Sequence, residues 1–242
     1  FDGELIPSVY MPPLYPFCLY IINLISFDKL NFISLVIFFQ LLLSILSIYI
    51  FYKINLKFFS EKLSLINASF FSFFPLNIYA AGQISSINLQ ITLSLLFLYF
   101  LILLNNDQNK KTLIFFSIVS GLLILTRGEF ILIFLVFVTF LFLKKKIQTF
   151  NLIKIILIVV LVISPYLIRN YTHFNKVVIV KSLGFNLWKG NNHLSTPQGF
   201  ENLNEFNSLK SRINKIEKNK NYEIQRVKIF LEEAKKNLLE DP

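Results

Sequence analysis

Two arginine-containing motifs stand where apolar runs end, and both could bind an anion. "LTRGE" occupies residues 125–129 and "SPYLIRNYTHF" occupies residues 164–174. Arginine is rare here, since only four of the 24 basic residues are Arg. Its planar guanidinium presents a rigid fork of donors that matches phosphate oxygens, whereas Lys is a point charge. Arg127 with Glu129, and Arg169 with Asn170, are therefore candidate substrate-binding residues.

The elements that position these residues are predicted to be membrane helices. The chain is 55% hydrophobic, holds 28 Phe and has a positive mean hydropathy. Residues 63–106 carry no charge and would form a helix of about 66 Å, roughly twice the thickness of a bilayer core. The stretch must fold back, and "AAGQISS" (80–86) is the natural break. We expect an all-α multi-pass membrane bundle.

Six spans are expected within a bundle domain at 30–168. The fourth and fifth are short and could instead form one over-long helix across "RGE". As a hairpin they place Lys110 and Lys111 on the side of Lys144, Lys145 and Lys146, as the positive-inside rule favours. The tail after residue 168 then faces outward. The expected spans are 30–52, 63–81, 86–104, 112–127, 129–143 and 152–168.

The first apolar stretch, "PPLYPFCLYIINLISF" (12–27), has only 16 residues and three Pro. If it spanned the membrane, residues 1–11 would be cytoplasmic. A short Pro-led segment can instead lie in the interface. We prefer a juxtamembrane helix within an outer-face segment, 1–29, and this places Tyr15 at the same membrane edge as the two Arg motifs.

The tail domain, 169–242, is expected to be small and extracytoplasmic. "KVVIV" (176–180) predicts a short strand, and "GFNLWKGNN" (184–192) predicts a Gly-punctuated loop. Apolar residues recurring at helical spacing predict an amphipathic helix from about Tyr222 to Leu239. The Lys/Glu face of that helix is interpreted as a solvated surface.

Several other functional classes are not supported. HExxH, GxSxG and P-loop motifs are absent from the sequence, and His173 and His193 have no carboxylates at a ligand spacing, so we expect no metal and no cofactor. The single Cys18 excludes an internal disulfide. The net charge of +10 comes from span ends and from a tail that also holds eight acids. That distribution does not suit nucleic-acid binding.

Three segments resemble one family. "MPPLYPFCLY", "GLLILTRGEF" and "ISPYLIRNYTHFNKVVIVKSLGFNLWKGNN" are similar, in this order, to motifs of the family 39-type membrane glycosyltransferases of the GT-C fold. Relatives are protein O-mannosyltransferases and aminoarabinose transferases of lipid A. The motifs are a Pro-Pro-Leu-Tyr segment, a Leu-Thr-Arg helix end, and a Pro-Tyr-x-x-Arg-Asn exit followed by Gly-x-Asn-Leu-Trp-x-Gly-Asn-Asn. The last motif adds Asn192 to the candidate substrate-binding residues.

The resemblance implies transfer of a sugar from a polyprenyl-phosphate carrier to a lipid, glycan or protein acceptor. It also implies a multi-pass protein of a bacterial inner (cytoplasmic) membrane, in contact with membrane lipid. The family's catalytic acid lies in an outer loop upstream of the Pro-Pro segment, so we expect this chain to be a fragment without it. Where many relatives have Ser-Glu, this chain has Ser85 and Ser86 followed by Ile87 and Asn88.

Two rival functions stay open from the sequence. A transporter or flippase of lipid-linked glycans would tend to carry ionisable groups or broken helices near the midplane. A non-catalytic scaffold would use the Arg residues only as snorkelling anchors, with Tyr15 at headgroup level. Anchoring explains less well why Arg lies on the outer side, against the charge bias.

Overall fold

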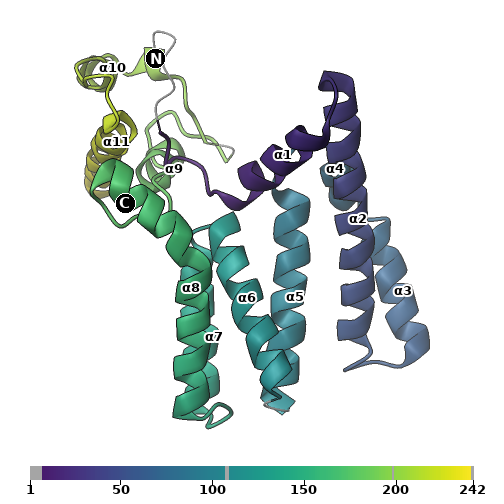
Figure 1. Ribbon diagram of the computed structural model, residues 1–242. Coiled ribbons are helices and arrows are strands. Elements are labelled where there is room, and N and C mark those ends of the chain that lie inside the picture. The colour runs from purple at the N-terminus through teal and green to yellow at the C-terminus, as the bar shows by residue number, and fades with distance from the viewer. Residues whose placement is uncertain (1–6, 107–108, 198, 241–242) are drawn as a thin grey trace. The chain divides into compact units, whose positions relative to one another are not determined.

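The computed structural model describes residues 7–106, 109–197 and 199–240, and within them every regular element is a helix (Figure 1). This confirms the expected all-α class. The chain forms two compact units: a bundle unit, Pro13–Pro165, and a tail unit that joins the residues up to Pro12 to those from Tyr166 onward. The first six residues of the expected outer-face segment lie outside the described residues.

Eight helices belong wholly or in part to the bundle unit. They are α1 (Leu14–Ile25), α2 (Lys29–Asn55), α3 (Glu61–Ser72), α4 (Pro75–Ala81), α5 (Ile87–Asn106), α6 (Lys110–Thr126), α7 (Phe130–Leu143) and α8 (Thr149–Phe174). Helix α8 runs through the boundary between the units, and Pro165 lies inside it there. Proline has no backbone N–H to donate to the Leu161 carbonyl, and that oxygen accepts from the Ser164 hydroxyl at 2.9 Å.

Three of these helices, α2, α5 and α8, are long and apolar enough to cross a membrane. The pair α3 and α4 adds a fourth if it counts as one span, with a bend of 57° at the break before Pro75. Helices α6 and α7 have 17 and 14 residues, below the roughly 20 of a typical span. Among the described residues, length and composition therefore support three of the six expected spans, or four if α3 and α4 count as one.

Helices α6 and α7 form the expected hairpin rather than one long helix. Only the three residues Arg127–Glu129 separate them, and the chain reverses there, so that α6 begins at the end of the bundle where α7 finishes (Figure 1). Lys110 and Lys144 consequently lie at the same end of the bundle unit. This arrangement agrees with the sidedness that the positive-inside rule predicts.

The apolar segment after Pro13 forms the short helix α1, which lies across the long helices instead of running parallel to them (Figure 1). Its 12 residues rise only about 18 Å, too little for a bilayer core. It contacts α2 and α6. Helix α2 begins directly after it because the Asp28 carboxylate accepts from Asn31 N at 2.7 Å and caps the first turn.

The bundle is packed by α5, which lies between α2 and α6. Phe97 on α5 meets Phe116 on α6 with ring centroids 5.1 Å apart. Gly121 allows α6 to approach α8, because a Cβ there would lie 2.7 Å from a Val162 methyl. Large apolar side chains elsewhere are exposed, for example Leu161 and Val136. That surface suits hydrocarbon rather than water.

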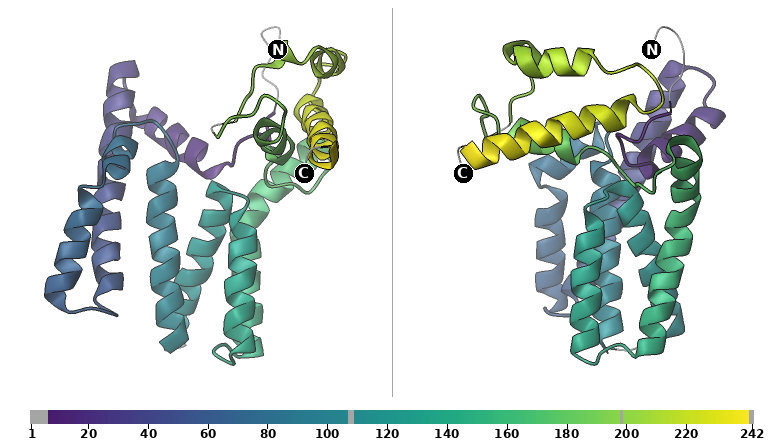
Figure 2. Two further views of the ribbon diagram at one scale, coloured as in Figure 1. Left: turned by 180° about the vertical axis from the view of Figure 1, so that it is seen from behind. Right: turned by 90° about the vertical axis from the view of Figure 1, so that its left-hand side faces the viewer.

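The tail unit holds α9 (Leu183–Gly190), a 3₁₀ turn (Leu203–Glu205), α10 (Asn207–Asn214) and α11 (Tyr222–Glu240), the last two visible in Figure 2. The expected amphipathic helix is confirmed as α11. Its apolar face closes a core with α9 and α10, made of Trp188, Leu209, Ile213, Phe230 and Ala234.

Two local expectations for the tail are wrong. Residues 176–180 form no strand: the Val178 carbonyl is bound by the Asn170 side chain, so the segment has no ladder partner. Residues 184–192 are not a loop but contain most of α9. Phe185 and Trp188, three residues apart, both pack against Phe230 of α11, and this tertiary contact outweighs the local Gly signals.

Candidate functional site

Arg169 is held in a defined orientation within the tail unit. Its Nη1 donates to the Ser8 carbonyl at 2.9 Å and to Asn170 Oδ1 at 2.8 Å. The guanidinium carbon lies 5.8 Å from the Tyr166 ring centroid and 5.6 Å from that of Phe174. Among the described residues, Nε and Nη2 have no partner. The fork of Arg169 therefore keeps two of its nitrogens available for an anion.

The Asn170 side chain is hydrogen-bonded to Arg169 and is not exposed to solvent. Its side chain is fully buried, and Nδ2 donates to the Val178 carbonyl at 2.7 Å while Oδ1 accepts from Arg169. The amide thus ties the end of α8 to the segment that follows it. A role for Asn170 in substrate binding would be indirect, through the orientation of Arg169.

Arg127 and Glu129 lie at the turn between α6 and α7. Arg127 ends α6, with its backbone N–H bonded to the Leu123 carbonyl. Its Nη1 lies 3.5 Å from Glu129 Oε1, and the two side chains are 42% and 61% exposed. Such an open pair contributes little to stability. Arg127 is therefore free to exchange Glu129 for a ligand oxygen.

Tyr15 is attached to a buried polar node that the sequence analysis did not identify. Gln40, in the middle of α2, is fully buried, and its Nε2 donates to Tyr15 Oη at 3.0 Å. The same nitrogen lies 2.9 Å from the carbonyl oxygens of Gln83 and Ser85. Gln40 thereby connects α1 to α2 and to the turn before α5. Its Oε1, and the Ser85 hydroxyl, are buried without a partner in the described part of the chain.

The polar network continues one turn further along α2 and α5. Asn88 Nδ2 donates to Ser44 Oγ at 3.0 Å and to the Gln40 carbonyl at 3.3 Å, and Ser47 Oγ lies 2.8 Å from Thr92 Oγ1. Interhelical bonds of this kind fix helix pairs where no water competes. The sequence did contain a signal for this site, because Gln40 is a polar residue inside an apolar predicted span, and such residues are often functional.

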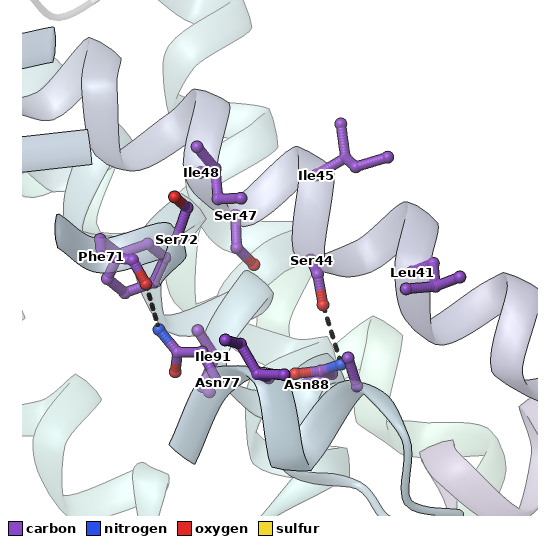
Figure 3. A pocket seen from close by; sticks show the side chains of 12 residues that line it. Leu41, Ser44, Ile45, Ser47, Ile48, Phe71, Ser72, Asn77, Asn88 and Ile91 are labelled. Carbon is purple, nitrogen blue, oxygen red and sulfur yellow. Dashed lines mark hydrogen bonds between the residues drawn. The ribbon is translucent and has the colours of Figure 1, made fainter. Parts of the chain in front are cut away.

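A cavity of about 250 Å³ lies beside this network, between α2, the end of α3, α4 and α5 (Figure 3). Leu41, Ile45 and Ile48 of α2 supply apolar lining, and Ser44 and Asn88 join across it by their hydrogen bond (Figure 3). The lining is predominantly apolar. It can accept a hydrocarbon segment more readily than a sugar or a phosphate.

The Asn192 side chain is hydrogen-bonded to the backbone around it. It is buried, its Nδ2 lies within hydrogen-bond distance of the carbonyls of Trp188, Lys189 and Phe200, and its Oδ1 accepts from Leu194 N. These bonds close the turn after α9. A ligand could reach the Asn192 amide only by displacing backbone groups.

The expected site residues divide between the units. Tyr15, Arg127 and Glu129 belong to the bundle unit, and Arg169, Asn170 and Asn192 to the tail unit. Arg169 with Asn170 is a direct contact, as is Arg127 with Glu129. No group of three or more His, Cys, Asp or Glu that could hold a metal ion occurs within residues 7–106, 109–197 and 199–240.

Comparison with known proteins identifies the family to which the chain belongs. Residues 11–168 match the family model described as dolichyl-phosphate-mannose-protein mannosyltransferase. The match covers well over half of the sequence and confirms the family resemblance; it contains the first two motifs and the start of the third, and it ends at Ile168, one residue before Arg169. No curated protein and no solved structure matches the chain.

Proposed function

The chain belongs to the dolichyl-phosphate-mannose-protein mannosyltransferase family. We propose that it transfers a sugar from a polyprenyl-phosphate carrier to an acceptor at the extracytoplasmic face of the membrane. The family match over residues 11–168 carries this proposal. Membership supports a membrane glycosyltransferase, and the apolar helices supply the membrane-embedded scaffold. We further propose the identity of the carrier, the class of the acceptor and the residues that bind them.

Arg169 is the proposed contact of the carrier phosphate. When the sugar leaves, its bond to the phosphate oxygen breaks and negative charge develops on that phosphate. A guanidinium already oriented at that oxygen stabilises the charge without reorganising. Asn170 and the Ser8 carbonyl hold Nη1 of Arg169, which leaves Nε and Nη2 for the phosphate. Arg127 is a second candidate for the same role, held only by an exposed ion pair.

The apolar cavity of the bundle unit is proposed to receive part of the polyprenyl chain. Leu, Ile and Phe make up half of its twelve lining residues, the others being Ser, Asn and one Ala, and the helices that supply them include two membrane-spanning candidates, α2 and α5. A hydrocarbon chain there would replace lipid contacts with packed protein contacts.

The proposal is tested with variants of Arg169 in the complete protein. A charge-assisted contact of about 1.5–3 kcal/mol predicts that Arg169→Ala lowers transfer from a polyprenyl-phosphate-linked sugar by one to two orders of magnitude. Arg169→Lys should also fall, because it keeps the charge and loses the fork. Lys176→Ala, which removes an exposed basic side chain two residues after the end of α8, is the matched control. Wild-type transfer by an inserted Arg169→Ala protein would refute the phosphate role.

One structural feature favours a second candidate function, transport of a lipid-linked glycan. The break between α3 and α4, bent by 57°, resembles the discontinuous helices of transporters. The described spans nonetheless have their ionisable residues at the ends. The two functions differ in one observable, because a transporter moves the carrier intact whereas a transferase separates sugar from carrier.

A further inference from the structure

The tail unit contains a second cavity that the proposed transfer does not yet use. It has a volume of about 140 Å³ and lies between the N-terminal segment, α9 and α11. Its lining consists of Tyr10, Phe185, Glu223, Arg226, Val227 and Phe230. All six belong to the tail unit, so the cavity is built within one compact body.

Arg226 is the lining residue of this cavity that has an unsatisfied donor. Its Nε is buried and has no hydrogen-bond partner in the described part of the chain. The guanidinium carbon lies 5.4 Å from the Phe230 ring centroid, which fixes the plane of the group. A buried donor left without an acceptor is costly, and native proteins usually satisfy it with protein, water or ligand.

The other polar groups of the cavity are the Glu223 carboxylate and the Tyr10 hydroxyl. Glu223 accepts from Ser8 Oγ at 2.9 Å and from Val9 N at 2.8 Å, so its carboxylate is anchored without pairing to Arg226. Burial raises the pKa of Tyr10, whose hydroxyl therefore remains a neutral donor and acceptor at physiological pH. The cavity thus offers one cationic donor, one anionic acceptor and one hydroxyl.

The charges around the cavity balance, and this favours an uncharged ligand. Four charged groups act on Tyr10: Arg226 and Lys189 are positive, Glu201 and Glu223 negative. Lys189 and Glu201 neutralise each other at 2.7 Å. Arg226 and Glu223 remain and carry opposite signs, so neither an anion nor a cation is selected by net charge. A neutral molecule with several hydroxyls can bond both.

Most of the apolar lining of the cavity consists of aromatic side chains. Tyr10 and Phe185 meet edge to face at 6.2 Å, and Phe185 meets Phe230 at 5.1 Å. Planar apolar walls with a few polar groups at fixed positions are typical of specific small-molecule sites. A sugar ring combines apolar C–H faces with hydroxyls around its edge, and the cavity offers a matching combination on a scale that admits one ring.

We propose that this cavity binds one neutral sugar ring of a glycan acceptor. The inference rests on the proposed function, since an acceptor is the second substrate of the transfer. The ring would lie against Phe185 and Phe230, with hydroxyl oxygens accepting from Arg226 and a hydroxyl donating to Glu223. The tail unit would then select the acceptor by its sugar.

Trp188 provides a direct readout. It is the only Trp in the sequence, it is fully buried, and its ring centroid lies 4.9 Å from that of Phe230 and 6.0 Å from that of Phe185. The complete protein, with any Trp other than Trp188 replaced by Phe, is titrated in detergent with the methyl glycosides of mannose, glucose and galactose. At least one should change Trp188 fluorescence saturably. Saturation-transfer NMR of the same glycosides gives a readout independent of the Trp.

Variants identify the cavity as the binding site. Arg226→Ala should weaken binding by about 10-fold or more, and Tyr10→Phe by about 3- to 10-fold. Arg212→Ala is the matched control, because Arg212 lies on α10 and pairs with Glu232 and Glu233 outside the cavity. The Arg212→Ala protein should bind the glycosides with the affinity of the wild type. Unliganded Trp188 emission shows whether each variant folds, and Tyr10→Phe decides if Arg226→Ala does not.

Three results would overturn the inference: no glycoside response by either method, equal binding by wild type and the folded cavity variant, or stronger binding of inorganic phosphate or glucuronate than of the neutral glycosides. The last would make the cavity an anion site. Glycoside binding without transfer from a lipid carrier would instead leave the cavity a sugar site, and it would refute the proposed function and the role of that sugar as acceptor.

Discussion

Substitution of Gly184 should disrupt the packing on which the tail unit depends. Gly184 lies in the first turn of α9, against α11. A Cβ at this position would lie 2.3 Å from the Val227 carbonyl oxygen and 3.0 Å from Leu231 N, both backbone atoms. Neither can be moved by a change of rotamer. Gly184→Ala must therefore separate the two helices by about 1 Å to reach ordinary contact, because interiors are close-packed.

The size of the effect follows from opposing contributions. Gly to Ala within a helix gains up to about 1 kcal/mol of helix propensity. Overpacking of a core costs typically about 1–3 kcal/mol, and the clash with rigid backbone belongs at the upper end or above. We expect a net loss of about 2 kcal/mol. For a unit of 60–100 residues this lowers the melting temperature by about 8–16 °C.

The assay is thermal unfolding followed by Trp188, which is fully buried in the same core. Gly190→Ala at the other end of α9 is the matched control, because a Cβ there meets nothing within 4 Å. It should leave the transition unchanged or raise it slightly. If Gly184→Ala melts at the wild-type temperature, α9 and α11 do not pack as closely as described.

Three further outcomes are expected. Gln40→Ala removes the donor to Tyr15 Oη and two carbonyls and should destabilise the bundle by about 1–3 kcal/mol, measured by unfolding in detergent; an unchanged midpoint would contradict the network. Arg127→Ala breaks only an exposed ion pair and should change stability by less than about 1 kcal/mol in the same assay. In a Cys18→Ser background, an impermeant thiol reagent should label His193→Cys and not Lys145→Cys from outside; the reverse pattern would invert the orientation.

The sequence was sufficient to predict the class of the bundle and its reversals. Charge-free length requires the chain to fold back, and the Lys clusters favour a hairpin over one long helix at 127–129, as observed. The amphipathic helix was equally accessible, because Val227, Phe230 and Ala234 recur at helical spacing and are buried. These features depend on local composition and periodicity.

Other features depend on contacts between distant residues and could not be predicted. The expected strand at 176–180 failed because the Asn170 side chain, not a neighbouring strand, binds Val178. The helix α9 forms where Gly and Asn suggested a loop, because Trp188 packs on α11. The node at Gln40 arises only once the turn at 83–85 lies beside α2.

The candidate site shows the same division. Arg127 and Arg169 could be selected because Arg is rare and both end apolar runs, and the structure shows Arg169 oriented by Asn170. Asn192 was selected through the family resemblance, and the structure shows its amide bonded to backbone groups. The cavity around Arg226 combines three segments that lie far apart in the sequence, so no motif marks it.

The most direct test of the central claim follows both parts of a doubly labelled donor. The complete protein is reconstituted in liposomes with a polyprenyl-phosphate-linked sugar, labelled in the sugar and in the lipid, together with a glycan or protein acceptor. A lipid-dependent glycosyltransferase predicts that the sugar label moves to the acceptor while the lipid label stays in the membrane as polyprenyl phosphate. If both labels stay together, and the intact donor only changes leaflet, the protein is a transporter and not a glycosyltransferase.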